Sequence, residues 1–101
     1  MKKIFDASNG ALDYKEVIKN LKDILIDNDE NYSKFCPLSD DRVKKPAQKM
    51  RKMLESMGAD FVSFPTLEQT EYKFQLVLEY GEDFTACWFT VDYWNGEVYA
   101  G

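Results

Sequence analysis

Few residues in this sequence could carry out catalytic chemistry. The chain of 101 residues contains no histidine, so the usual triads and imidazole general bases are absent. Its two cysteines, Cys36 and Cys87, do not have the spacing of a zinc site, and Cys87 fits the pattern of a buried strand residue. There is no glycine-rich phosphate-binding loop. We therefore expect a protein that is not an enzyme and that holds no cofactor and no metal ion.

Carboxylates in the C-terminal half offer one combination that could act as an acid–base pair. Asp92 could work with Glu79 or with Glu97 if the fold brings them together. This combination is unspecific, because paired acids on a strand surface more often keep a protein soluble. We interpret these carboxylates as part of a binding surface.

Charge is divided unevenly along the chain. Residues 55–101 contain nine acidic residues and one lysine, a net charge of −8, whereas residues 1–54 have a net charge of +3. This division predicts a polarised molecule with an acidic sheet and a partly basic helical side. The acidic half argues against nucleic acid as its partner and favours a basic protein.

Six basic residues fall between Arg42 and Lys52. They could bind phosphate or nucleic acid, but no aromatic residue is interleaved with them and no groove-reading motif surrounds them. A solvated helix face is the simpler interpretation of this cluster.

Two helices are predicted in the N-terminal half. Asp13 has the position of an N-cap, with Glu16 three residues later, and apolar residues then recur with a helical period up to Leu25. This pattern predicts a helix over residues 13–27. Pro46 favours the first position of a second helix, because a proline deeper in a helix costs roughly 3 kcal/mol. We therefore predict a short turn over 40–45 and a helix over 46–57.

From Phe61 onward, apolar residues alternate with polar ones, which is typical of strands with one buried face. The predicted strands span residues 61–64, 71–80, 85–94 and 97–100. Asn95-Gly96 predicts a two-residue type I′ turn, which would pair Tyr93 with Val98. A loop of two or four residues around 81–84 keeps the apolar residues of the two long strands on one face.

The same alternation leaves an unusual set of side chains on the outer face of the sheet. Two tryptophans and a tyrosine lie there among carboxylates, and Trp and Tyr often dominate the binding energy of protein interfaces. We predict that a partner binds at Glu79, Trp88, Asp92, Trp94, Glu97 and Tyr99. Two alternatives stay open, namely aromatic stacking or cover within the chain and a homodimer through this face.

The sequence predicts a single α+β domain over residues 1–101, with two or three N-terminal helices on one face of a mostly antiparallel four-stranded sheet, in the order α-α-β-β-β-β. We expect a cytoplasmic protein, because no apolar segment is long enough to cross a membrane. The predicted function is a binding module of the inhibitor or immunity type that docks a basic partner. The alternative is a small-ligand-binding or enzymatic domain with a pocket near Tyr72, Tyr80 and Tyr93.

Overall fold

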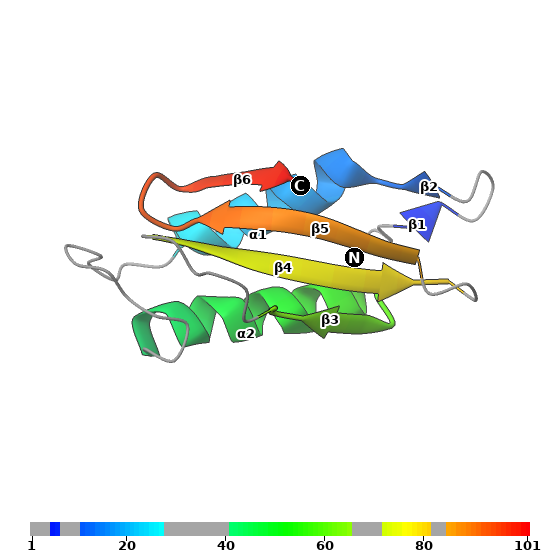
Figure 1. Cartoon of the computed structure of the whole chain (residues 1–101), viewed down its shortest axis with the longest axis horizontal. Coiled ribbons are helices and arrows are strands. Elements are labelled where there is room, and N and C mark those ends of the chain that lie inside the picture. The colour runs from blue at the N-terminus through cyan, green and yellow to red at the C-terminus, as the bar shows by residue number, and fades with distance from the viewer. Residues whose placement is uncertain (1–4, 7–10, 28–40, 66–71, 82–84) are drawn as a thin grey trace.

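The fold comes from a computed structural model, which describes residues 5–6, 11–27, 41–65, 72–81 and 85–101. Its elements are β1 (Phe5–Asp6), β2 (Ala11–Leu12), α1 (Tyr14–Ile26), α2 (Asp41–Ser56), β3 (Phe61–Ser63), β4 (Lys73–Tyr80), β5 (Thr85–Asp92) and β6 (Glu97–Ala100). Both helices lie behind the same face of the sheet formed by β3 to β6 (Figure 1). The predicted α+β class is confirmed, as is the order of two helices followed by four strands. Neither described helix is long and apolar enough to span a bilayer.

A small ladder that the sequence did not predict precedes α1. Strands β1 and β2 pair antiparallel, with Phe5 opposite Leu12 and Asp6 opposite Ala11. They form a separate two-stranded sheet. Each strand has only two residues, which is too short for an alternating pattern to be recognised.

Helix α1 begins where the sequence predicts. The carboxylate of Asp13 accepts a hydrogen bond from the backbone N–H of Glu16 at 3.1 Å and caps the first turn. Val17, Leu21 and Leu25 recur at helical spacing and form its buried face. The predicted range of 13–27 differs from α1 only by the capping residue at each end.

Helix α2 starts five residues earlier than predicted. It runs from Asp41 to Ser56 with Pro46 inside it, so the expected turn over 40–45 is wrong. Pro46 has no N–H to donate to the carbonyl four residues before it, and an internal proline costs roughly 3 kcal/mol. The additional turn, however, buries Val43 completely, which is worth about 1.5–3 kcal/mol. Because Pro46 is buried as well, packing against the core outweighs the local preference of the proline.

The main sheet is antiparallel throughout and has the order β3-β4-β5-β6, so β3 and β6 are its edge strands. Leu76 lies opposite Phe89 on the core side. Tyr80 pairs with Thr85, so four residues connect β4 to β5. This is one of the two loop lengths that the hydrophobic pattern requires.

The turn between β5 and β6 differs from the prediction. Asp92 pairs with Glu97, so four residues connect these strands instead of two. A type I′ turn needs positive φ at both Asn95 and Gly96, and of these two only Gly96 has it, at 71°. The true register is shifted by two residues, an even number, so the residues that remain within β5 and β6 stay on their predicted faces.

One hydrophobic core joins both helices to the inner face of the sheet. Leu21 of α1, Met50 and Leu54 of α2 and Phe89 of β5 are completely buried within it. Helix α1 lies against β6, and α2 lies against β3. We call the side of the sheet opposite the helices the open face.

Candidate partner-binding face

The strand register determines which side chains share the open face. Side chains alternate along each strand, so residues opposite one another on neighbouring strands lie on the same face. Trp88 lies opposite Val77, and Val77 lies opposite Ser63. By this alternation, the open face consists of Phe61, Ser63, Lys73, Gln75, Val77, Glu79, Ala86, Trp88, Thr90, Asp92, Glu97 and Tyr99. The set includes five of the six predicted partner-binding residues and lacks Trp94.

Three large aromatic side chains on the open face are exposed to solvent. Trp88 and Tyr99 are 41% and 42% exposed, and Phe61 is 57% exposed. They belong to β5, β6 and β3, so they span the width of the sheet. Several exposed aromatic rings on one face are typical of a surface that another molecule covers.

Phe61 is the part of this face that the sequence analysis missed. Its pairing with Glu79 places it on the open face, and its neighbour Val62 points into the core. The signal in the sequence is ambiguous, because Phe61 and Val62 are both apolar and alternation alone cannot say which of the two is buried. In the structure α2 packs against β3, and Val62 is the residue that is buried.

Trp88 is well placed to cover an apolar neighbour. Val77 is only 6% exposed although it belongs to the open face. Its direct neighbour on β5 is Trp88, and a large ring opposite a β-branched side chain is a stabilising cross-strand pair. A ring supported in this way loses little conformational freedom when a partner binds its exposed side.

The sequence predicts Asp92 among the partner-binding residues of the outer face, but in the structure its side chain is buried. It is 4% exposed. Its Oδ1 accepts hydrogen bonds from the backbone N–H groups of Trp94 and Asn95 at 3.1 and 3.0 Å, and its Oδ2 accepts one from Asn95 Nδ2 at 2.9 Å. These bonds hold the four-residue turn together. Asp92 therefore shapes one end of the open face.

Trp94 lies in this turn and not in a strand, since β5 ends at Asp92 instead of continuing to residue 94. Its ring packs against that of Tyr72 in a tilted arrangement, with 4.6 Å between centroids, and remains half-exposed. Tyr72 in turn packs against the hydrophobic core. For Trp94, this contact agrees with the alternative of aromatic packing within the chain. Among the described residues, neither Trp88 nor Tyr99 contacts another ring.

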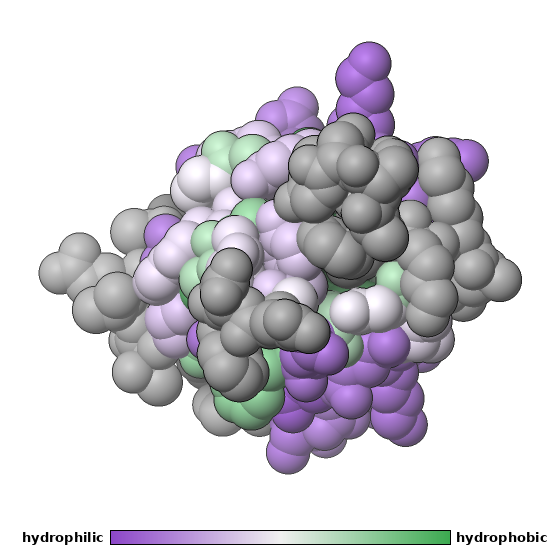
Figure 2. Space-filling model, turned by 90° about the vertical axis from the view of Figure 1, so that its right-hand side faces the viewer, coloured by the Kyte–Doolittle hydropathy of each residue, from purple (hydrophilic) through white to green (hydrophobic). Residues whose placement is uncertain are grey.

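Charge separates the two sides of the molecule. Glu97 is exposed and Glu79 partly exposed on the open face, where Lys73 is also partly exposed. Helix α2 carries the opposite charge on its solvent side, with Lys44, Lys45, Lys49 and Lys52 all exposed. Figure 2 shows a broad area of strongly hydrophilic residues at the bottom of the view, on the side where Figure 1 places α2.

On the core side of β5, Cys87 is a buried free thiol, as its place in the strand pattern predicts. The hydroxyl of Tyr14 and the sulfur of Cys87 lie 3.4 Å apart. This hydrogen bond, together with burial, raises the pKa of Tyr14 to about 12. Burial and the nearby Cys87 also raise the pKa of Tyr80. Both phenols keep their protons at neutral pH, so they are unsuited to act as bases.

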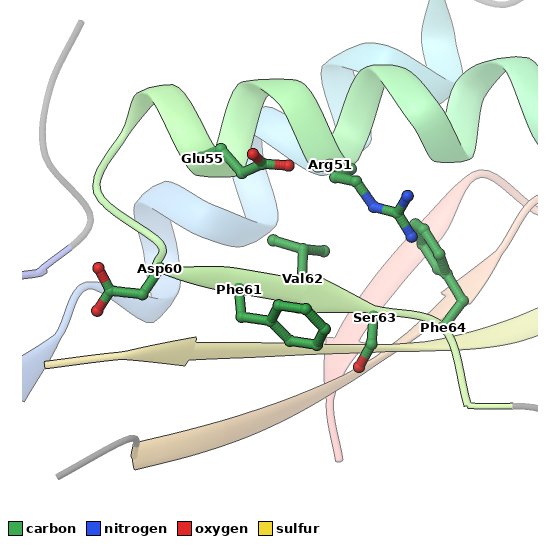
Figure 3. A pocket seen from close by; sticks show the side chains of 7 residues that line it. All are labelled: Arg51, Glu55, Asp60, Phe61, Val62, Ser63 and Phe64. Carbon is green, nitrogen blue, oxygen red and sulfur yellow. The ribbon is translucent and has the colours of Figure 1, made fainter.

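Tyr72, Tyr80 and Tyr93, near which the alternative pocket is expected, are part of the packed core or lie against it. A groove of about 620 Å³ lies elsewhere, between α2 and β3 (Figure 3). It is lined by Arg51, Glu55, Asp60, Phe61, Val62, Ser63 and Phe64. No group of three or more Cys, Asp or Glu side chains is arranged to hold a metal ion within the described part of the chain. Cys36 lies outside those residues.

Comparison with known proteins gives no functional assignment. No protein-family model matches the chain, and neither a curated protein nor a solved structure matches it significantly.

Proposed function

We propose that this protein is a non-catalytic binding module, of the inhibitor or immunity type, that docks a basic protein through the open face of its sheet. The observation that carries the proposal is the exposure of Phe61, Trp88 and Tyr99 on one face, with Glu79 and Glu97 beside them. The six partner-binding residues predicted from the sequence then divide into two groups. Glu79, Trp88, Glu97 and Tyr99 contact the partner, while Asp92 and Trp94 form the end of the face.

The three aromatic rings supply the apolar part of the binding energy. A large aromatic side chain buries about 150–250 Å² in all, so roughly 100 Å² of each half-exposed ring is left for a partner to cover. At about 25 cal/mol per Å², the three rings together contribute a gross gain of about 7.5 kcal/mol. Association costs about 4–15 kcal/mol. The rings alone therefore support weak binding at most, and tight binding needs complementary charge.

Complementary charge favours a basic partner. Residues 55–101, which include all four strands of the main sheet and the last two residues of α2, have a net charge of −8. Such a field speeds the approach of a positively charged protein and repels acidic ones. A β-sheet face is also preformed, so little ordering is needed on binding, which suits a protein that blocks another protein's surface.

The proposal is tested by capture from a native lysate followed by measurement with the purified partner. Wild type is compared with a Trp88→Ala/Tyr99→Ala variant and with a control on the far side, Lys44→Ala/Lys49→Ala. Circular dichroism confirms that each variant is folded. We expect wild type and control to recover the same basic protein and the open-face variant to lose it. With the purified partner, the association rate should fall as the salt concentration rises.

Two results would contradict the proposal. Recovery of the same protein by wild type and by the open-face variant would place the binding site elsewhere. An association rate that does not depend on salt would remove the electrostatic part of the proposal, and with it the reason for a basic partner.

A further inference from the structure

The groove between α2 and β3 runs along the edge of a strand. Five consecutive residues, 60–64, line it. Residues 61–63 of this run form β3, and successive side chains of a strand point to opposite faces, so a hollow that touches all three follows the strand's edge. Figure 3 shows this arrangement, with Val62 directed toward α2 and with Phe61 and Ser63 directed to the other side.

This edge of β3 is unpaired within the described residues. β3 is the first strand of the sheet and has β4 as its only described neighbour. Backbone groups on such an edge form a template for one further strand. The opposite wall of the groove is α2, which contributes Arg51 and Glu55 from adjacent turns. An edge strand facing a helix is a geometry in which an extended peptide can add to a sheet.

The two ends of the groove differ in their chemistry. At one end, the guanidinium of Arg51 lies over the ring of Phe64, 5.0 Å from its centroid. At the other end, Glu55, Asp60 and Phe61 line the groove, and Phe61 is 57% exposed. Asp60 Oδ2 accepts a hydrogen bond from the backbone N–H of Gly81 at 2.9 Å, and Figure 3 shows its carboxylate directed away from α2. Glu55 therefore supplies the carboxylate on the α2 side of the groove, which suits a lysine or arginine side chain.

We propose that this groove holds an extended segment of the basic partner, which adds to the edge of β3 as a further strand and places a lysine or arginine beside Glu55. This inference rests on the proposed function, because the segment belongs to the protein that covers the open face. Phe61 connects the two parts, since it belongs to the open face and also lines the groove. The binding site therefore continues from the open face around the β3 edge onto α2.

The test uses short peptides with blocked ends and the full chain. One peptide alternates lysine with valine, and two others carry glutamine or glutamate in place of lysine. Backbone amide shifts in NMR spectra report where each peptide binds. We expect shifts at residues 60–64 and at Arg51 and Glu55 with the lysine peptide, weaker binding of the glutamine peptide and no binding of the glutamate peptide.

Two variants with the same change in charge give a matched comparison. Glu55 lines the groove, whereas Asp23 lies on α1, which packs against β6 at the other edge of the sheet, and both are exposed. We expect Glu55→Lys to weaken binding of the lysine peptide about fivefold or more, because it replaces an attraction by a repulsion. Asp23→Lys should change this affinity by less than about twofold.

Several outcomes would overturn the groove as a binding site. These are shifts confined to residues 88 and 99, equal weakening by both variants, or no shifts with any peptide. With the purified partner, the two proposals fail separately. Binding that is lost in Trp88→Ala/Tyr99→Ala but unchanged in Glu55→Lys would refute the groove and leave the open face. Loss in Glu55→Lys alone would refute the open face as the main contact and support the groove.

Discussion

At the scale of single residues, Asp92 shows how a side chain can change its role when the fold is known. In the sequence it is one carboxylate in an acidic segment, indistinguishable from Glu79 or Glu97. In the structure it is buried and accepts three hydrogen bonds from the turn that follows it. The distinction depends on a turn geometry that the Asn95-Gly96 pair does not predict.

We expect Asp92→Ala to destabilise the protein by about 2 kcal/mol, because it removes the acceptor of three hydrogen bonds around a buried charge. Asp92→Asn keeps one acceptor oxygen and should cost about half as much. Glu97→Ala, in the residue opposite, is the control and should stay within about 0.5 kcal/mol of wild type because Glu97 is exposed. Urea unfolding measures all three. Equal stability of Asp92→Ala and Glu97→Ala would show that the carboxylate does not stabilise the turn.

Tyr14 makes the stability of the protein depend on alkaline pH. The pKa of its hydroxyl is raised from 10.0 to about 12, chiefly by the hydrogen bond to Cys87. Between these values the folded state keeps a proton that the unfolded state has lost, so the contribution to stability is complete below pH 10 and is lost as the pH rises toward 12. Tyr14 is 44% exposed, so solvent screening makes the effect small.

We expect wild type to lose its stability advantage over Tyr14→Phe across this pH range. Urea midpoints measured at increasing pH give the comparison. In Cys87→Ala, the pKa of Tyr14 should move back toward its ordinary value, which phenolate absorbance can follow with Tyr14→Phe/Cys87→Ala as the reference. An unchanged pKa in Cys87→Ala would mean that the hydrogen bond is not the main cause of the shift.

At the scale of elements, the successful predictions are those in which a local pattern and the core agree. Helix α1 has both a capping residue and a regular apolar stripe, and β4 and β5 alternate over eight residues each, so their faces could be assigned from the sequence. Helix α2 could not be delimited in this way, because its first turn is set by the burial of Val43 against distant parts of the chain. Local preference at Pro46 points the other way.

The early start of α2 has a direct test at Lys44, which is exposed and lies outside the helix predicted from the sequence. In a helix, glycine is less favourable than alanine by up to about 1 kcal/mol. We therefore expect Lys44→Gly to be less stable than Lys44→Ala by about 0.5–1 kcal/mol in urea unfolding. Equal stability of the two variants would mean that residues 41–45 do not form a helical turn.

At the scale of the whole molecule, charge bears on whether the open face would accept the proposed basic partner or a second copy of the chain. A dimer with two-fold symmetry would bring the same patch of both copies together. Glu79 and Glu97 of one copy would then approach the carboxylates of the other, while the exposed rings supply only the modest gain derived above. The same charges that favour a basic partner thus oppose a second copy of this chain across the open face.

We accordingly expect sedimentation velocity at low salt to give the monomer mass of 11.8 kDa at every protein concentration. Two kinds of association would contradict this expectation, and salt distinguishes them. A dimer that strengthens as salt screens the carboxylates would be held by the aromatic rings of two open faces, and Trp88→Ala would weaken it. A dimer that weakens with salt would join the acidic sheet of one copy to the basic side of α2 on another, and Lys44→Ala/Lys49→Ala would weaken it. A monomer at every salt concentration leaves the open face available for a different protein.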